Sequence, residues 1–315
     1  MPADLIPSHY TTEFNNNWIS RLQQQKSRTD PFVDTISFTG ERKRFDRVGA
    51  SQSRLRTERM GVTNIQNVAT DSRWAFRRNY DIGKMLDKDD AANLGQLVLP
   101  TSQYVMDHTS EYNRNFDDLV YQTALGSAVV GELGNTNQTF AQGGGVAITE
   151  AATAGLTLSK LIKVSEVFMN AEIDPGMERC IMLTSRQLSN LLDSSAIGGS
   201  AVFTSSDYAA IKALVAGTID TFMGFKFIVN NRIPKYTTNA ETALVASNDL
   251  AGFRPCVAFV KGAIKMIKGT ISTRIDQRSD LSYATQIYSS WDLGGVRVHD
   301  EAVCKIQCYE ATFTA

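Results

Sequence analysis

The chain has 315 residues, of which 43% are hydrophobic and 21% are charged, with 22 Gly and 7 Pro. This composition is typical of a folded protein of about two domains, and it excludes collagen, a disulfide scaffold and wholesale disorder. The net charge of −1 provides no overall field that would attract nucleic acid or a membrane surface. Residues 1–20 lack the apolar core of a signal peptide, and no apolar run is long enough to span a bilayer. We therefore expect a protein that stays in the cytosol where it is made.

The four cysteines, at positions 180, 256, 304 and 308, lie within or beside apolar, strand-like stretches. We expect them to be small buried side chains in a reducing compartment. The spacing of Cys304 and Cys308 could be half of a metal site, but no CxxC pair occurs and the chain has only three histidines. The sequence therefore predicts neither a zinc site nor a cofactor.

The first third of the chain is polar and extended. Residues 1–34 carry isolated apolar anchors, which suits an arm that becomes ordered by lying on another surface. Two strand-like stretches, Thr35–Val48 and Asp71–Leu86, then flank the polar, basic span Gly49–Thr70. We predict a long two-stranded excursion over residues 35–86 with a mobile tip, and such a ribbon needs a surface to pack on.

Helical patterns follow the excursion. Asp89–Val98 is predicted to be a short helix stopped by Pro100, and Thr101–Leu125 to be one long helix ending at Gly126. At about 100° per residue, this long helix has an apolar face and an opposite face that carries charged side chains. The charged positions on that face are Asp107, Glu111, Arg114 and Asp118.

The charge changes sign between the excursion and the long helix. Residues 36–84 contain eleven basic and five acidic residues, a net charge of +6, whereas residues 85–120 contain two basic and seven acidic residues, a net charge of −5. Adjacent segments of opposite sign suggest that one could bind the other in a second copy. The alternative is that both are solvated faces.

The remaining sequence alternates between strand and helix patterns. Residues 126–155 are rich in glycine and indicate strands or loops, and residues 158–168 have the spacing of an amphipathic helix. Helices are also predicted from Thr184 or Ser185 onward and over 205–215, the latter ending at Gly217. Gly217 and Gly224 are candidates for positive φ in turns. The predicted strands are 179–183, 225–229, 243–246, 256–260, 284–293, 296–299 and 302–308.

No pattern of catalytic residues stands out. The chain lacks GxSxG, GxxxxGK[ST], GxGxxG and HExxH motifs, and the glycines 143–145 lack the Lys and Ser/Thr of a phosphate-binding loop. The Asp pairs 89–90 and 117–118 are adjacent on predicted helices and face different directions. We therefore predict that the protein is not an enzyme, although a hydrolase with dispersed catalytic residues stays open. Aromatic residues among the cations of the excursion leave a nucleic-acid-binding protein as a second alternative.

Three segments carry a resemblance to a known family: Ser206–Ile228, Thr273–Tyr288 and, upstream of both, Ile181–Leu188. Together they resemble the major capsid proteins of tailed bacteriophages, many of them short-tailed, whose subunits have the Hong Kong 97-like fold. The resemblance covers about Leu158–Cys308, and it is only architectural before that. An encapsulin-type nanocompartment shell protein uses the same subunit fold and is the alternative within it.

The resemblance implies an α+β capsid fold with five segments. These are an N-terminal arm (1–34), an extended β-hairpin loop (35–86), a first peripheral part with a spine helix over 101–125 (87–177), an axial domain (178–266) and a second peripheral part (267–315).

It also implies a function and partners. Copies of the chain would form pentamers and hexamers of an icosahedral head that encloses double-stranded phage DNA, with non-specific DNA contact on the inner face. The shell would assemble in the host cytoplasm, and the protein would then be part of the capsid of the virion. About 34 residues precede the excursion, too few for a fused scaffolding segment, so the resemblance implies either a separate scaffolding protein or an already trimmed chain. The initiator Met favours a separate scaffolding protein. A portal and possibly a decoration protein are further expected partners, and a membrane is not.

The sequence leads to one hypothesis about an inter-subunit interface. The basic excursion of one subunit is predicted to lie along the acidic segment of the next. The residues assigned to this interface are Arg42, Lys43, Arg44, Arg73, Arg77 and Arg78 on the basic side and Asp107, Glu111, Asp117 and Asp118 on the acidic side.

Overall fold

The computed structural model describes residues 23–60, 63, 65, 67–86, 101–149, 154–193, 213, 221–236, 252–281 and 283–310. Within these residues the chain is a mixed α+β protein, as the sequence predicts. Some predicted features lie outside the described residues: most of the N-terminal arm, the helices at 89–98 and 205–215, the strand at 243–246 and Gly217.

The described helices are the 3-10 helix η2 (Asp30–Phe32), α2 (Thr101–Leu125), α3 (Leu158–Asn170) and α4 (Ser185–Asp193). The strands are β1 (Asp34–Ser37), β2 (Arg42–Val48), β3 (Thr70–Phe76), β4 (Arg78–Leu86), β5 (Ala128–Val130), β6 (Thr136–Gln138), β7 (Val146–Ile148), β8 (Arg179–Leu183), β9 (Thr221–Phe222), β10 (Phe225–Val229), β11 (Gly252–Phe253), β12 (Cys256–Val260), β13 (Ile264–Arg278), β14 (Ala284–Arg297), β15 (Val303–Ile306) and β16 (Tyr309–Glu310). The predicted bounds of α2, β8, β10 and β12 are confirmed.

The chain divides into two compact units. The smaller unit consists of Met1–Lys26, Asn79–Arg114 and Thr270–Asp292, and the larger unit of Ser27–Arg78, Asn115–Gly269 and Leu293–Ala315. The described strands form four sheets, with the orders β1-β13-β14-β4, β7-β15-β12-β8-β10-β9, β11-β16 and β2-β3-β5-β6.

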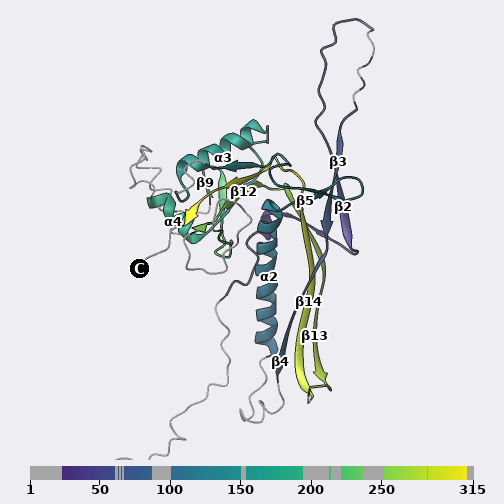
Figure 1. Cartoon of the computed structure of the whole chain (residues 1–315), viewed down its shortest axis with the longest axis vertical. Coiled ribbons are helices and arrows are strands. Elements are labelled where there is room, and N and C mark those ends of the chain that lie inside the picture. Colours follow the sequence, from purple (N-terminus) through teal and green to yellow (C-terminus); the bar gives the residue numbers. More distant parts are fainter. Residues whose placement is uncertain are drawn as a thin grey trace, which may run out of the picture. The chain divides into compact units, whose positions relative to one another are not determined.

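The six-stranded sheet is the apolar centre of the larger unit. Every residue of β8 and β12 is buried, which is why these strands are nearly continuous runs of apolar residues in the sequence. Helix α3 lies against the sheet (Figure 1) and buries Leu161, Val164 and Phe168. The ring centroids of Phe168 and Phe225, on β10, are 6.3 Å apart.

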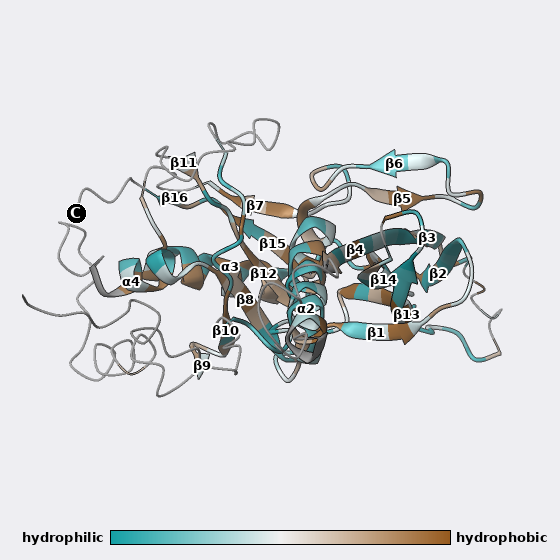
Figure 2. Ribbon diagram, turned by 90° about the horizontal axis from the view of Figure 1, so that it is seen from below, coloured by the Kyte–Doolittle hydropathy of each residue, from teal (hydrophilic) through white to brown (hydrophobic). Residues whose placement is uncertain are grey.

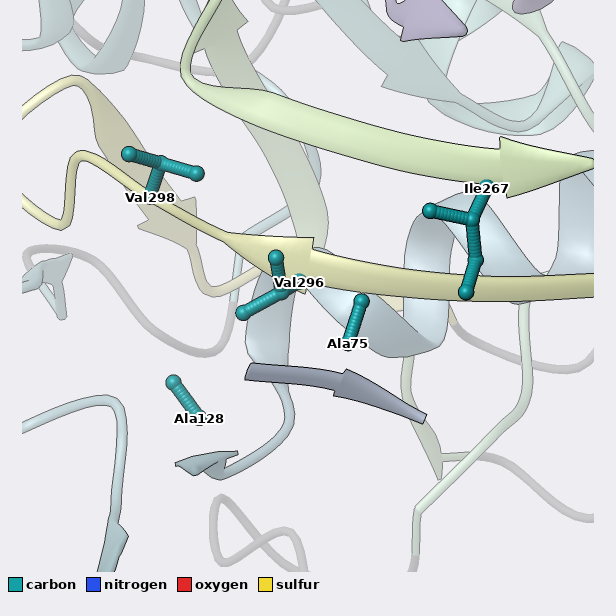
Figure 3. Close-up of a cluster of buried hydrophobic side chains, with 5 residues drawn as sticks. All are labelled: Ala75, Ala128, Ile267, Val296 and Val298. Atoms are coloured by element: carbon teal, nitrogen blue, oxygen red, sulfur yellow. The ribbon is translucent and has the colours of Figure 1, made fainter. Parts of the chain in front are cut away.

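A second cluster of apolar side chains anchors the β2–β3 hairpin in the larger unit. Ala75 on β3 packs with Ala128, Ile267, Val296 and Val298, which come from segments far apart in the sequence (Figure 3). Phe38, Phe45 and Val130 are partly buried against this cluster. Figure 2 shows the contrast in composition, with β7 in the colour of apolar residues and β2 mostly in that of polar ones.

The predicted excursion is shorter than residues 35–86. Its two paired strands are β2 and β3, which run antiparallel with Arg42 opposite Phe76 and Val48 opposite Thr70. The flanking strands β1 and β4 belong to a different sheet, where β1 runs parallel to β13. The ribbon therefore consists of β2, β3 and the segment 49–69 that joins them.

The two strands predicted at 284–293 and 296–299 are one strand, β14. Gly294 and Gly295 look like a break in the sequence, but here they permit close packing. A Cβ on Gly294 would lie 2.3 Å from the Phe76 carbonyl oxygen and 2.8 Å from the Ile267 side chain. Glycine is therefore needed at position 294 because another backbone approaches closely, and not because the chain turns there.

Two other predicted glycine roles can be compared with the structure. Gly224 has a φ of +78° and Met223 a φ of +52°, so the prediction of positive φ at Gly224 is confirmed. These two residues form the tight turn of the β9–β10 hairpin, whose central positions both need positive φ in a type I′ turn. Gly126 does end α2, but without positive φ: a Cβ there would lie 2.5 Å from the Gln122 carbonyl oxygen.

Candidate subunit-contact surface

The hairpin β2–β3 carries most of the basic residues assigned to the interface, and its two faces differ. Successive side chains of a strand point to opposite faces, so residues 42, 44 and 46 share one face and residues 43, 45 and 47 the other. Cross-strand register places Arg44 opposite Trp74 and Phe45 opposite Arg73. We call the face with Arg44 and Trp74 the outer face, and the face with Phe45 and Arg73 the inner face.

Arg73, on the inner face, belongs to a buried network of ion pairs and hydrogen bonds. Arg73 is fully buried, and its Nη2 lies 2.6 Å from Asp300 Oδ2. Its Nη1 donates to Gln138 Oε1 at 2.7 Å, and its Nε lies 3.1 Å from Asp71 Oδ2. The assignment of Arg73 to a contact with another subunit is therefore wrong, because the guanidinium is enclosed by its own chain.

Arg297 completes this network from β14. Its Nε donates to Asp300, and its Nη1 donates to the carbonyl oxygens of Ala124 and Gly126 at 2.7 and 2.8 Å. Those carbonyls end α2, so the cation lies at the negative end of the helix dipole. Both Arg297 and Asp300 have no exposed surface. One carboxylate thus joins the hairpin, the end of α2 and β14.

On the outer face, cations gather over one indole ring. The guanidinium carbon of Arg42 lies 4.8 Å from the Trp74 ring centroid and that of Arg44 lies 6.0 Å from it. The Trp74 Nε1 donates to the Gly131 carbonyl at 2.7 Å, which fixes the ring. Phe76 is 37% exposed beside them. Tryptophan and arginine side chains are enriched in protein–protein interfaces.

The charge on the outer face is partly balanced within the chain. Arg44 Nε lies 2.5 Å from Asp46 Oδ1, and both side chains are exposed. Hydrogen bonds from Ser72 and then Arg44 hold the pKa of the Asp46 carboxyl below its usual range. Asp46 therefore stays ionised in weak acid, and the outer face keeps a mixed but mainly cationic character.

The other basic residues of the hypothesis lie at the base of the hairpin. Lys43 is half-buried with its Nζ 5.9 Å from the Phe45 ring centroid. Arg77 and Arg78 are exposed, and Arg78 lines a cavity of about 560 Å³ together with Asp118 and Arg232.

The acidic side of α2 is occupied by its own chain. In the smaller unit, Asp107 Oδ2 lies 2.5 Å from Lys84 Nζ, and Arg114 Nη2 lies 2.5 Å from Glu111 Oε2. In the larger unit, Asp118 Oδ2 lies 2.7 Å from Arg232 Nε. Burial raises the pKa of the Asp118 carboxyl in spite of Arg232, so this site disfavours the charged form.

Asp117 anchors the segment that precedes β1. Its carboxylate accepts hydrogen bonds from Ser27 Oγ and Thr29 Oγ1, each at 2.6 Å, and from the backbone N–H groups of Arg28 and Thr29, each at 3.1 Å. Asp117 is 2% exposed, so its assignment to a partner subunit is also wrong. The sequence gives no signal for this contact, because its donors lie almost 90 positions away.

Almost all the described residues of the segment 49–69 are exposed. Leu55 and Met60 are each 84% exposed and Ile65 is 87% exposed. These three side chains find no cover within the described residues. Large apolar side chains gathered in one exposed segment indicate a surface that another molecule covers.

No group of three or more His, Cys, Asp or Glu in the described residues is placed to hold a metal ion. The four cysteines are buried, as predicted, and none forms a disulfide. Buried His108 in the smaller unit has its Nδ1 2.8 Å from Ser289 Oγ. Among the described helices, none is long and apolar enough to cross a membrane.

Comparisons with known proteins identify the family and the fold of the chain. The sequence model of a family described as "Phage capsid protein" matches residues 6–310. No curated protein sequence matches the chain.

Solved structures of phage proteins are similar over nearly the whole chain. A chain of Mycobacterium phage Che8 has a TM-score of 0.66 at 14% identity, covering 97% of this chain and 98% of its own. A chain of the Cyanophage Pam1 capsid asymmetric unit has a TM-score of 0.69 at 13% identity, covering 98% and 100%. A chain of the capsid of Ralstonia phage GP4 has a TM-score of 0.66 at 11% identity, covering 100% of both chains. The predicted α+β capsid fold is confirmed.

Proposed function

The chain belongs to the phage capsid protein family, and on this basis we propose that its copies bind one another through the β2–β3 hairpin to close the shell of a virion head. As a phage capsid protein, it is a structural protein of the virion. The similar chains from Cyanophage Pam1 and Ralstonia phage GP4 come from capsids, which supports self-association of this chain.

The observation that carries the proposal is the exposure of the segment 49–69. Burying an apolar side chain such as Leu55 or Ile65 contributes about 1.5–3 kcal/mol, and a single copy leaves these side chains in water. A partner surface that covers them gains this free energy once for each subunit. Because a shell contains many identical contacts, modest gains at each one add up.

The outer face of the hairpin is the proposed polar part of the same contact. Arg42, Arg44 and Trp74 present cations and an aromatic ring to solvent, with Arg77 and Arg78 at the base. Each exposed ion pair with a neighbour contributes only about 0.2–1 kcal/mol, so these residues set register and specificity more than affinity.

The acidic partners are revised in this proposal. Asp117 is excluded by its burial, and Asp107, Glu111 and Asp118 each have a cation of their own chain beside them. A neighbour's arginine would have to share or displace that cation. We therefore assign these three acids a secondary part and the apolar segment the main one.

Further details follow from the family resemblance. We propose that residues 178–266 form an axial domain whose contacts build pentamers and hexamers, with arm 1–34, the β2–β3 ribbon and peripheral parts 87–177 and 267–315 around it. The shell would enclose double-stranded DNA without sequence preference, and assembly would take place in the host cytoplasm. A separate scaffolding protein, a portal and possibly a decoration protein would take part. We propose no catalytic reaction for the chain.

Electron microscopy of the purified full-length chain tests the function. We expect closed shells, tubes or ring-shaped capsomers, formed by the chain alone or with a scaffolding protein. A folded chain that stays monomeric at high concentration and at every salt concentration would contradict the proposal.

A further inference from the structure

Two of the four buried cysteines are in contact in the larger unit. The Sγ atoms of Cys256, at the start of β12, and Cys308, between β15 and β16, are 3.7 Å apart. Neither side chain has exposed surface, and both are free thiols. The remaining cysteines, Cys180 and Cys304, are equally buried but have no second thiol against them in the described residues.

The strand register explains why the two thiols meet. Cys256 lies opposite Ile306 in the β12–β15 pair, and Arg254 donates its N–H to the Cys308 carbonyl at 2.9 Å. The two cysteines are therefore diagonal neighbours on one face of the sheet, and their side chains point toward each other closely enough for the sulfurs to be in contact. A disulfide has an S–S bond of about 2.05 Å, so the sulfurs need to approach by less than about 2 Å.

Polar groups surround this thiol pair. The buried Nζ of Lys160 donates to the carbonyl oxygens of Ala154, Gly155 and Gln307 at 2.8–2.9 Å, which keeps a positive charge beside the segment that carries Cys308. The S–H of Cys256 lies between two acceptors, the Cys308 sulfur and Gln187 Oε1, the latter at 3.0 Å.

These neighbours shift the pKa values of the two thiols in opposite directions. Burial, followed by the contact with Cys308, raises the pKa of the Cys256 thiol well above its usual range. Burial alone would also raise the pKa of Cys308, but the hydrogen bond from Cys256 and the Lys160 ammonium together lower it. Cys308 is therefore the more acidic thiol of the pair, and Cys256 is the hydrogen-bond donor to its sulfur.

We propose that Cys256 and Cys308 form an oxidation site that a peroxide converts into an intrachain disulfide. The Cys308 thiolate attacks one oxygen of hydrogen peroxide, the O–O bond breaks, and the departing hydroxide takes a proton to become water. The Cys256 sulfur then attacks the Cys308 sulfenic acid, the S–O bond breaks, and the hydroxide leaves as water with the Cys256 proton. Two thiols and one peroxide thus give one disulfide and two waters, with two electrons passing from sulfur to oxygen.

The disulfide would act on stability. It would close a loop that contains β13, β14 and β15, and closing a long loop restricts the unfolded chain. We expect the oxidised subunit to unfold at a higher temperature than the reduced one. This inference goes beyond the proposed function and does not depend on it, because both thiols belong to one chain.

The test is treatment of the full-length chain with hydrogen peroxide, followed by thiol counting and peptide mass spectrometry. We expect the free thiols of the denatured chain to fall from four to two, with a peptide pair joined through Cys256 and Cys308 and a mass lower by two hydrogens. Reduction with a dithiol should restore all four thiols and the original thermal midpoint.

Variants supply the control. Cys304→Ser removes a buried thiol outside the pair and should still form the disulfide, whereas Cys256→Ser should not. Retention of all four thiols in the wild-type chain overturns the proposal. So does a disulfide that includes Cys180 or Cys304, or oxidation of Cys308 to sulfinic acid without a disulfide. The wild-type result decides the matter even if a variant does not fold.

Discussion

The inner and outer faces of the β2–β3 hairpin place the same residue type in opposite environments. Arg73 points inward and is fully enclosed, with Asp300, Asp71 and Gln138 around its guanidinium. Arg44, on the neighbouring strand, points outward over Trp74 and keeps 42% of its side chain exposed. Strand parity alone separates the two roles. The buried arginine is compensated by carboxylates of its own chain, whereas the exposed one stays open to solvent.

The comparison predicts the largest loss of stability for the carboxylate of the inner network. Asp300→Ala leaves two arginines, Arg73 and Arg297, buried without their shared counter-ion. We expect the free energy of unfolding of the free subunit to fall by about 3–5 kcal/mol in urea titrations, the usual cost of breaking a buried pair. Glu301→Ala is the matched control, because that side chain is half-exposed and should cost less than about 1 kcal/mol. Equal losses of unfolding free energy for Asp300→Ala and Glu301→Ala would contradict the prediction that the buried carboxylate matters more than the exposed one.

A glycine beside the same network sharpens the prediction. A Cβ on Gly143 would lie 2.6 Å from the Asp300 Cγ, so Gly143→Ala must displace the buried carboxylate. We expect a loss of about 1–3 kcal/mol, as for other overpacked sites. Gly176→Ala meets only an exposed Asp174 carboxylate oxygen at 3.2 Å and should change stability much less. A neutral Gly143→Ala would show that the network is loosely packed.

Two adjacent acids on α2 extend the comparison beyond the hairpin. Asp117 accepts hydrogen bonds from the segment 27–29, so Asp117→Asn should cost about 1–3 kcal/mol in the same titrations. Asp118 lies where burial raises its pKa, so Asp118→Asn removes a disfavoured charge and should cost less. The reverse order would mean that the Arg232 pair outweighs the contacts of Asp117.

His108 is a buried titratable group whose environment favours the neutral imidazole. Burial, followed by the positive charge of Lys84, lowers its pKa below the usual 6.5. As pH falls below about 6.5, the unfolded chain takes up a proton that the folded chain does not, so stability decreases with falling pH until the lowered folded pKa is reached. We expect unfolding titrations across this range to show that decrease in the wild type and a weaker one in His108→Asn. Identical pH profiles would contradict this prediction.

Local patterns predicted the regular elements well and the charged interior poorly. Strands β8 and β12 are continuous apolar runs, and α2 has an amphipathic period. These signals lie in neighbouring residues, so the predicted bounds of all three elements agree with the structure. Arg73 and Asp300, by contrast, are 227 positions apart, and nothing near either residue signals the other. Composition rules assign such charges to the surface, which is why Arg73 was placed in an interface.

Lys160 shows the same limit in α3. The apolar side chain of Ile162 is 50% exposed in this helix, whereas the side chain of Lys160 is 1% exposed. The lysine is buried because three backbone carbonyls, one of them from Gln307, accept hydrogen bonds from its ammonium group. Tertiary hydrogen bonds of this kind override the preference of a single side chain for water.

The central claim is that the β2–β3 hairpin contacts another subunit, and charge reversal on its outer face, with the double variant Arg42→Glu and Arg44→Glu, tests it most directly. Because both side chains are exposed, we expect the free energy of unfolding of the free subunit to fall by no more than about 1–3 kcal/mol, the cost of their contacts with Trp74 and Asp46. Shell formation, followed by light scattering and electron microscopy, should be lost, whereas Lys163→Glu on the exposed side of α3 should leave it intact. Shells formed by the double variant at wild-type yield and shape would contradict the claim.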